Sequence, residues 1–458
     1  MKLPRYPKYK NSGVEWLGEV PEHWTIRPLR YLIDRLESGT SVNAVDDPAA
    51  DGEIGVLKTS CVYSGSFDPT ENKTVVANEV SRVSCPLRAG TLIVSRMNTP
   101  ELVGATGLVK VAPKNLFLPD RLWQVSFNDA VPAYIYYWSQ SVLYRAHIRS
   151  VCSGTSSSMQ NLGQDQYRAF VLATPPVPEQ QAIALFVDKE IWKIDALVKE
   201  QRRLIELLKE KRQAVISHAV TKGLNPDAPM KDSGIEWLGE VPEHWDVKRI
   251  KYAIRKLEQG WSPQCENFPA EDGEWAVLKV GCVNGGNFNP GENKALPPEL
   301  TPIPELGICV GDVLISRANT RELAGSTAVA ESDYPRLLLC DKLYRLRLHA
   351  EVCLPEYLAM FLSTPSARGE IELSATGASS SMVNIGQSTI TEMLMPLPPV
   401  REQERIAAFV NDETGKTDQL IAAATHAIDL LQERRTALIS AAVTGKIDVR
   451  GLSGTEAA

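Results

Sequence analysis

The chain has 458 residues, a formal net charge of −7, 43% hydrophobic residues and 23% charged residues. This balance is ordinary for a soluble globular protein, and no apolar run approaches the roughly 18 residues of a membrane span. Residues 1–10 lack an apolar signal core, and the eight cysteines include no Cys-x-x-Cys pair. We therefore expect a cytoplasmic protein with free thiols and no zinc site. The negative charge disfavours nucleic-acid binding by bulk electrostatics alone, so such binding would need locally placed basic residues or basic partners.

The first element in chain order is a motif that occurs twice. Residues 12–24 read Ser-Gly-Val-Glu-Trp-Leu-Gly-Glu-Val-Pro-Glu-His-Trp, and residues 233–245 repeat them with one conservative change. The motif is apolar and contains turn formers, so we interpret it as a packing clasp or a partner surface rather than a ligand site. This gives an N-terminal clasp at 1–24 and a linker with a second clasp at 223–245.

Each clasp is followed by a region of short apolar runs, at 25–177 and 246–400. Thr91-Leu92-Ile93-Val94 and Asp312-Val313-Leu314-Ile315 are examples, and Gly, Asn, Ser and Pro turns separate such runs. Short runs of β-formers between turn residues are typical of strands. We expect an α/β globular domain with several short strands in each region.

The two regions are copies of one another. Val56-Leu57-Lys58 returns at 277–279, which is 221 positions later, and Ser158-Met159 returns at 381–382, which is 223 positions later. Two residues are therefore inserted between these points. A period this long indicates a duplicated domain rather than a solenoid. Two similar units in one chain can be related by a pseudo-twofold axis, a geometry that suits two half-sites on one elongated ligand.

A polar motif recurs in both domains. Ser95-Arg96-x-Asn98-Thr99 returns as Ser316-Arg317-x-Asn319-Thr320. Arginine can contact guanine through two hydrogen bonds, asparagine can do the same with adenine, and serine and threonine suit phosphates. A buried arginine–carboxylate pair is the structural alternative.

A serine-rich segment follows in both copies. Gly154-Thr155-Ser156-Ser157-Ser158-Met159-x-Asn161 is matched by Gly377-Ala378-Ser379-Ser380-Ser381-Met382-x-Asn384. Such a turn offers backbone N–H and hydroxyl donors to phosphate. An ordinary flexible loop is the alternative interpretation.

Two long helices are predicted, at 178–222 and 401–446, with a short tail at 447–458. Each begins after a Pro-Pro-Val-x-Glu-Gln sequence, at 175–180 and 398–403. Apolar or small residues recur at steps of three and four, the pattern of a coiled coil that needs a partner for its stripe. These positions are Val187, Ile191, Ile194, Val198, Ile205, Leu208, Val215 and Ala219 in the first helix, and Val410, Thr417, Ile421, Ala424, Ile428, Leu431, Leu438 and Ala442 in the second.

Enzyme signatures are weak. Gly415-Lys416-Thr417 has Val410 where a phosphate-binding loop needs its first glycine, and no Gly-x-Ser-x-Gly or zinc spacing occurs. Glu71-Asn72-Lys73 and Glu292-Asn293-Lys294 do recur, each with an aspartate 20 positions before its glutamate (Asp51 and Asp272). A metal-dependent nuclease could hold Mg²⁺ with such a set, so a duplicated Mg²⁺-dependent endonuclease remains one alternative. A structural adaptor without DNA contact is a second.

The combination of motifs resembles the specificity subunit of type I restriction–modification systems. Two domains alternate with two long helices, each domain follows the Trp-Leu-Gly-Glu-Val-Pro-Glu-His-Trp motif, and each helix follows Pro-Pro-Val-x-Glu-Gln. The resemblance covers nearly the whole chain. It implies an α/β (α+β) chain with two target-recognition domains and two long helices that pair as an antiparallel coiled coil, in a pseudo-twofold duplicated arrangement.

The resemblance also implies a non-catalytic, DNA-binding role. Each domain would read one half of a bipartite site on double-stranded DNA, and the paired helices would act as a ruler and as the dock for two methyltransferase subunits. Those partners would carry adenine methylation with S-adenosylmethionine, and a restriction and translocase subunit would use ATP and Mg²⁺. We expect this chain to bind no cofactor, metal or membrane itself.

The candidate DNA-binding residues come from the recurring motifs and from turn positions where the two copies differ. In the first domain they are Lys58, Ser60, Tyr63, Arg96, Asn98, Thr99, Ser156, Ser157 and Ser158. In the second they are Lys279, Asn284, Arg317, Asn319, Thr320, Arg321, Ser379, Ser380 and Ser381.

Overall fold

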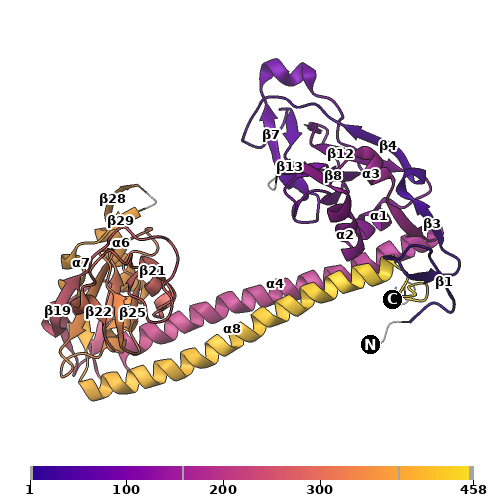
Figure 1. Cartoon of the computed structure of the whole chain (residues 1–458). Helices are drawn as coiled ribbons and strands as arrows, with labels where there is room; N and C mark the ends of the chain where they lie inside the picture. The colour runs from indigo at the N-terminus through magenta and orange to yellow at the C-terminus, as the bar shows by residue number, and fades with distance from the viewer. Residues whose placement is uncertain (1–3, 157–158, 380–381, 453–458) are drawn as a thin grey trace. The chain divides into compact units, whose positions relative to one another are not determined.

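The computed structural model describes residues 4–156, 159–379 and 382–452. The chain forms two compact units, and Figure 1 labels some of their elements. Unit 1 comprises Met1–Gln201 and Thr425–Ala458, and unit 2 comprises Arg202–Ala424. Each unit therefore contains one globular domain, the start of one long helix and the end of the other. Within the described ranges, no helix is long and apolar enough to cross a membrane.

The domain of unit 1 is built from small sheets and short helices. The hairpin β1 (Tyr9–Asn11) and β2 (Glu19–Pro21) precedes β3 (Thr25–Pro28), which pairs with β15 (Val171–Thr174). The first four-stranded sheet has the order β10 (Thr106–Leu108), β8 (Leu92–Ser95), β12 (Leu122–Phe127), β4 (Ile33–Ser38). The second has the order β11 (Leu116–Phe117), β6 (Gly55–Leu57), β7 (Asn72–Val75), β5 (Ala44–Val45). A three-stranded sheet of β13 (Ser153–Ser156), β14 (Met159–Asn161) and β9 (Met97–Asn98) follows, with helices α1 (Pro132–Ser139), α2 (Val142–Val151) and α3 (Gln164–Arg168).

Unit 2 repeats this domain with small changes. It contains the hairpin β16 (Met230–Asp232) and β17 (Glu240–Pro242), and the pair β18 (Asp246–Arg249) and β30 (Leu394–Leu397). Its first four-stranded sheet has the order β19 (Ile254–Gln259), β27 (Leu343–Leu348), β23 (Val313–Ser316), β25 (Thr327–Val329). Its second has the order β21 (Asn293–Ala295), β20 (Ala276–Leu278), β26 (Tyr334–Leu338), β22 (Gly307–Ile308). The three-stranded sheet has the order β24 (Ala318–Asn319), β29 (Met382–Asn384), β28 (Thr376–Ser379). Its short helices are α5 (Pro355–Leu362), α6 (Pro365–Ser374) and α7 (Gln387–Thr391). The two extra residues lie between β27 and α5, where residues 349–354 replace residues 128–131.

The apolar runs of the sequence are strands buried on both faces. Along β8, Leu92 and Val94 point into a core formed with α1 and α2, whereas Ile93 points into a second core that includes Cys61 and Val62. Because successive side chains of a strand point to opposite faces, a strand between two cores must be apolar at every position. β23 repeats the arrangement with Val313 and Ile315 against Leu314.

The two long helices are α4 (Val177–Lys222) and α8 (Val400–Val443), and they run antiparallel within each unit. In unit 1, Asp195 of α4 forms an ion pair with Arg435 of α8 (3.8 Å). In unit 2, Arg212 of α4 forms an ion pair with Asp418 of α8 (3.2 Å). These two ion pairs are equivalent under the 223-residue repeat. The apolar stripe expected from the sequence is buried or half-buried along both helices. The predicted antiparallel coiled coil and the α/β fold class are confirmed.

The clasps hold the helix starts. The Glu179 carboxylate accepts hydrogen bonds from Tyr6 Oη (2.6 Å) and Trp24 Nε1 (3.0 Å) and lies 2.8 Å from His23 Nε2. In unit 2, Glu402 lies 2.8 Å from His244 Nε2. The glutamate of Pro-Pro-Val-x-Glu-Gln therefore binds the histidine of the repeated motif in both units.

Each domain also contacts the C-terminal end of a long helix: the first domain contacts α8, and the second contacts α4. Tyr134 Oη donates to the carbonyl oxygens of Ala173 (2.8 Å) and Val443 (3.1 Å), so the first domain contacts the last residue of α8. Tyr357 Oη donates in the same way to Pro396 (2.8 Å) and Val220 (3.0 Å), near the end of α4. Both tyrosines are fully buried.

The cores of the two domains differ at one ionic network. In unit 2 the fully buried Arg345 donates to Glu258 Oε2 (2.7 Å) and lies 3.5 Å from Asp312 Oδ2. The equivalent residues in unit 1 are Gln124 and Thr91, which form a neutral hydrogen bond of 3.2 Å. An ionic group in one copy thus replaces a neutral pair in the other.

We predict that Arg345→Gln lowers the stability of unit 2 by about 1–3 kcal/mol, because it removes the buried guanidinium from Asp312 and Glu258 and leaves them Arg347 (2.7 Å) and Lys256 (2.8 Å) as ion-pair partners. The double variant Arg345→Gln with Asp312→Thr copies unit 1 and should regain part of the loss. The free energy of opening is measured by hydrogen exchange at the amides of β23 and β27. A double variant no more stable than the single one would contradict this account.

Candidate nucleic-acid interface

The two recurring polar motifs meet in the three-stranded sheet of each domain. β9 pairs with β14 in the register Asn98 to Gln160, and Leu162 N donates to the Arg96 carbonyl (2.8 Å). In unit 2, β24 pairs with β29, and Ile385 N donates to the Arg317 carbonyl (2.9 Å). The structure therefore places the Ser-Arg-x-Asn-Thr segment beside the serine-rich segment, although the sequence separates them by some 60 positions.

Asn98 is the centre of a hydrogen-bonded turn in unit 1. Its Nδ2 donates to Tyr63 Oη (2.9 Å) and to Ser95 Oγ (3.1 Å), and its Oδ1 accepts from Thr99 N (2.9 Å). The side chain is 6% exposed. Tyr63 is 40% exposed, and its hydroxyl also lies 2.8 Å from Thr59 Oγ1. The Asn98 amide is occupied inside the protein, whereas the Tyr63 ring reaches the surface.

Unit 2 keeps the asparagine and changes its partner. Asn319 Oδ1 accepts from Thr320 N (2.9 Å), and its Nδ2 contacts Ser316 Oγ (3.4 Å) and Asn284 Oδ1 (3.3 Å). Asn284 replaces Tyr63 and is exposed. The same support therefore presents a phenol in one domain and an amide in the other.

Arg96 and Arg317 stack on buried aromatic rings. The guanidinium carbon of Arg96 lies 5.8 Å from the Trp123 ring, and that of Arg317 lies 5.9 Å from the Tyr344 ring. Within the described ranges neither arginine forms an ion pair, so the carboxylate pair considered as an alternative is not formed there. Arg317 also donates to the Asp341 carbonyl (3.2 Å). The rings orient both guanidinium groups and leave their charge uncompensated by any described carboxylate.

The remaining candidates are less uniform. Lys58 lies 3.0 Å from Asp46 and shares it with Lys73, and these hydrogen-bonded lysines lower the Asp46 pKa. Ser60 donates its hydroxyl to Glu71. In unit 2, Lys279 makes no ion pair with any described residue.

The last candidates lie at surface turns or in the serine-rich segments. The side chains of Thr99 and Arg321 are exposed, and that of Thr320 is half-buried. Ser156 and Ser379 belong to strands β13 and β28. Four further candidates lie outside the described residues: Ser157, Ser158, Ser380 and Ser381.

The repeated Glu-Asn-Lys sequence has a structural explanation. Asn72 is buried, its Oδ1 accepts from Ala49 N (2.8 Å) and its Nδ2 donates to the Pro69 carbonyl (2.9 Å). Asn293 makes the same two contacts, with Ala270 N (2.9 Å) and the Pro290 carbonyl (2.8 Å). Each amide ties two loops together. Across the described part of the chain, no group of three His, Cys, Asp or Glu side chains is placed to hold a metal ion.

Comparison with known proteins gives a consistent result. No family model matches the chain. The specificity subunit of the type I restriction enzyme EcoKI from Escherichia coli (strain K12) is 23% identical over 447 residues, which cover 94% of this chain and 90% of that protein. The putative MjaX specificity subunit of Methanocaldococcus jannaschii is 23% identical over 458 residues, which cover 98% of this chain and 99% of that protein. The EcoEI specificity subunit of Escherichia coli is 27% identical over 218 residues, 47% of this chain and 36% of that protein.

Solved structures share the fold. A structure described under the assembly and conformational transition of the type I R-M system covers 93% of this chain and 98% of its own, with a TM-score of 0.67 and 16% identity. The HsdS subunit from Thermoanaerobacter tengcongensis covers the same shares, with a TM-score of 0.51 and 18% identity. The chain is a homologue of type I restriction enzyme specificity subunits.

In this specificity-subunit homologue, several turn positions around the shared asparagine differ between the domains. The paired positions are Thr59 and Val280, Tyr63 and Asn284, Met97 and Ala318, and Pro100 and Arg321. Asn98 and Asn319 accept from the next backbone amide in both copies, whereas the backbone is helical at Tyr63 (ψ −33°) and extended at Asn284 (ψ 135°). Sequence analysis missed Trp123 and Tyr344, although an aromatic residue at both positions of the 221-residue repeat was a usable signal.

We predict that Asn98→Ala destabilises its turn by about 1–3 kcal/mol, because it leaves Thr99 N without an acceptor and removes two side-chain hydrogen bonds. Asn319→Ala is the matched variant and should cost less, since its side-chain contacts are longer, at 3.3 and 3.4 Å. Hydrogen exchange at β9, β14, β24 and β29 measures both. Equal losses in the two domains would refute this ranking.

Proposed function

We infer that this chain is the DNA-recognition subunit of a type I restriction–modification complex. Its two domains would each read one half of a bipartite site on double-stranded DNA. The observation that carries this inference is the hydrogen-bonded asparagine repeated at Asn98 and Asn319, which lies beside different exposed side chains in two domains of similar topology. Homology to specificity subunits across nearly the whole chain agrees with it.

The geometry divides the candidate contacts into two kinds. Arg96 and Arg317 project from aromatic rings without a described carboxylate partner, so they suit phosphate or guanine. Tyr63 and Asn284 contact the asparagine of the same motif and can meet base edges, where a phenol and an amide select differently. Asn98 and Asn319 would hold these side chains by hydrogen bonds, a role that differs from the direct adenine contact expected from the sequence.

The chemistry of modification and restriction would belong to partner subunits. We propose that two methyltransferase subunits dock on the paired helices and methylate adenine with S-adenosylmethionine, and that a translocase subunit with ATP and Mg²⁺ performs restriction. This chain would supply recognition only, within the cytoplasm. The supporting observation is that two residues of the nuclease alternative have other partners in unit 1: Glu71 accepts the Ser60 hydroxyl, and Lys73 pairs with Asp46 (3.1 Å).

The central test is selection from a random duplex pool by the chain together with its methyltransferase subunits. We expect one bipartite sequence with a fixed spacer to be enriched and methylated on adenine. Cleavage of plasmid by the purified chain with Mg²⁺ alone would support the endonuclease alternative instead. Recovery of unenriched duplex would support the adaptor alternative.

We predict that Arg96→Ala and Arg317→Ala each weaken DNA binding by about 1–3 kcal/mol, and each at one half-site only. The reason is the loss of one oriented cation per domain. Binding is measured on duplexes in which one half-site at a time is scrambled, so each variant serves as the control for the other. Unchanged affinity and methylation in both variants would remove these arginines from the interface.

A further prediction concerns the spacing of the half-sites. Four residues inserted in each helix, after Gln201 and after Ala424, lengthen each by about 6 Å. Because a base pair rises roughly 3.4 Å, the spacer should grow by about one or two base pairs while the half-site sequences stay the same. The insertion is a stutter in the heptad pattern, so local unwinding can absorb part of the change.

Methylation-site sequencing of the insertion variant gives the result directly. A variant that assembles and methylates with an unchanged spacer would show that the helices do not set the distance. Altered half-site sequences would lead to the same conclusion.

A further inference from the structure

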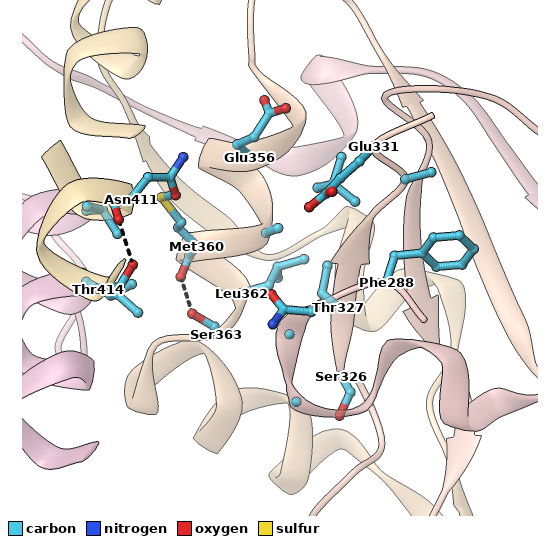
Figure 2. Close-up of a pocket in the computed structure, with 18 of the residues that line it drawn as sticks. Phe288, Ser326, Thr327, Glu331, Glu356, Met360, Leu362, Ser363, Asn411 and Thr414 are labelled. Carbon is cyan, nitrogen blue, oxygen red and sulfur yellow. Dashed lines mark hydrogen bonds between the residues drawn. The ribbon is translucent and has the colours of Figure 1, made fainter. Parts of the chain in front are cut away.

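Unit 2 contains a cavity of about 690 Å³ between its domain and the helix pair. α5 supplies Glu356 and Met360, and α8 supplies Asn411. Phe288 and Glu331 stand on the opposite wall, as Figure 2 shows. The cavity thus lies where the recognition domain meets both long helices.

In unit 1 the equivalent space is occupied by tyrosine side chains. Tyr136 Oη donates to the Gly65 carbonyl (2.6 Å), and Tyr137 Oη donates to Asp188 Oδ1 (2.6 Å). Both rings are buried, with 9% and 4% exposure. One phenol therefore braces the turn that follows Tyr63, and the other binds helix α4.

Unit 2 lacks these two rings but has a carbonyl oxygen at each receiving position, with an amide in place of the carboxylate of Asp188. The repeat places Ala359 and Met360 at the positions of Tyr136 and Tyr137. Gly286 and Asn411, the equivalents of Gly65 and Asp188, line the cavity. Within the described residues the Asn411 amide and the Gly286 carbonyl make no hydrogen bond. The cavity therefore has the space and the polar groups for a phenol that unit 2 itself does not provide.

The charges of the lining favour a cation. Glu322, Glu331 and Glu356 line the cavity and form no ion pair with any residue in the described ranges. The equivalents in unit 1 are Glu101, which pairs with Arg149 (2.9 Å), then Lys110 and Ala133. The acidic charge is thus particular to unit 2.

Two arginines also line the cavity and offset part of this charge. Arg212 is neutralised by Asp418 (3.2 Å). Arg368 donates Nη2 to the Glu322 carbonyl (2.9 Å), while its Nη1 is buried without a partner. Three carboxylates against one unneutralised arginine leave the cavity acidic, which disfavours phosphate and hence DNA as its occupant.

We propose that this cavity binds an aromatic side chain, with a basic group beside it, from a partner protein. Aromatic residues that fill a pocket are the common anchors of protein interfaces, and unit 1 shows with its own tyrosines that a phenol fits this place. The open carboxylates would pair with the basic group. This inference goes beyond DNA recognition and assigns unit 2 a contact that unit 1 satisfies internally.

The chemistry of the cavity can be tested with tyramine, which joins a phenol to an ammonium group. We expect saturable binding to the whole chain, seen as chemical-shift changes in residues of α5 and β25. The variant Ala359→Tyr with Met360→Tyr copies unit 1 and should weaken binding about tenfold or more by filling the space. p-Cresol, which lacks the ammonium group, should bind the wild-type chain more weakly. Equal binding of tyramine to both proteins, or none to either, would overturn the proposal.

The protein partner can be tested by titrating the chain with its methyltransferase and translocase subunits. The filled variant should assemble with at least one of them about tenfold more weakly, with unchanged half-site preference in DNA binding. The matched control is Tyr136→Ala with Tyr137→Met, which opens unit 1 and should leave that assembly unchanged. Unaltered assembly of the filled variant would overturn the assignment to a protein partner. If the wild-type chain shows no half-site preference in DNA binding, that result counts against the proposed function alone.

Discussion

The antiparallel pairing of the two long helices is the constraint on which the remaining structure depends. A helix of 46 residues with an apolar stripe cannot remain in water without a partner, and its pseudo-equivalent helix offers a matching stripe. Reversed direction brings the start of one helix to the end of the other within each unit. Asp195 then meets Arg435, and Arg212 meets Asp418, through the same contact. Each recognition domain is consequently fixed to both helices, as the hydrogen bonds of Tyr134 and Tyr357 show.

The sequence predicted those parts of the fold that a pattern of residue types shows directly, and it did not predict contacts between residues far apart in the chain. The repeat and the heptad stripe are visible in the order of residue types, and the two domains and two helices follow from them. Side-chain partners are not visible in that way. Asn98 and Tyr63 are 35 positions apart, and their hydrogen bond depends on how β9 is placed against the earlier turn that ends at Tyr63. The sequence therefore marked Asn98 as a contact residue without showing that its amide is occupied by the protein itself.

The two domains have diverged inside as well as outside. Differences at Tyr63 and Asn284 are expected of surfaces that meet different ligands. The replacement of Gln124 by Arg345, and of Tyr136 by Ala359, changes buried positions instead. Such changes are tolerated because each domain packs its own core, so that a substitution in one copy need not be matched in the other. Duplication has thus left one backbone with two differently filled interiors.

The discontinuity of unit 1 has a consequence for how the protein is made. Its core joins Trp24 and Leu29 to Ile439, Val443 and Val449, residues at opposite ends of the chain. Unit 2 lies in one continuous stretch, Arg202–Ala424. At translation rates of about 5–20 residues per second, the N-terminal domain waits roughly 12–50 seconds for the segment that completes its core. During that interval unit 2 can complete its own core while the domain synthesised first still exposes apolar surface, so folding need not follow the order of synthesis.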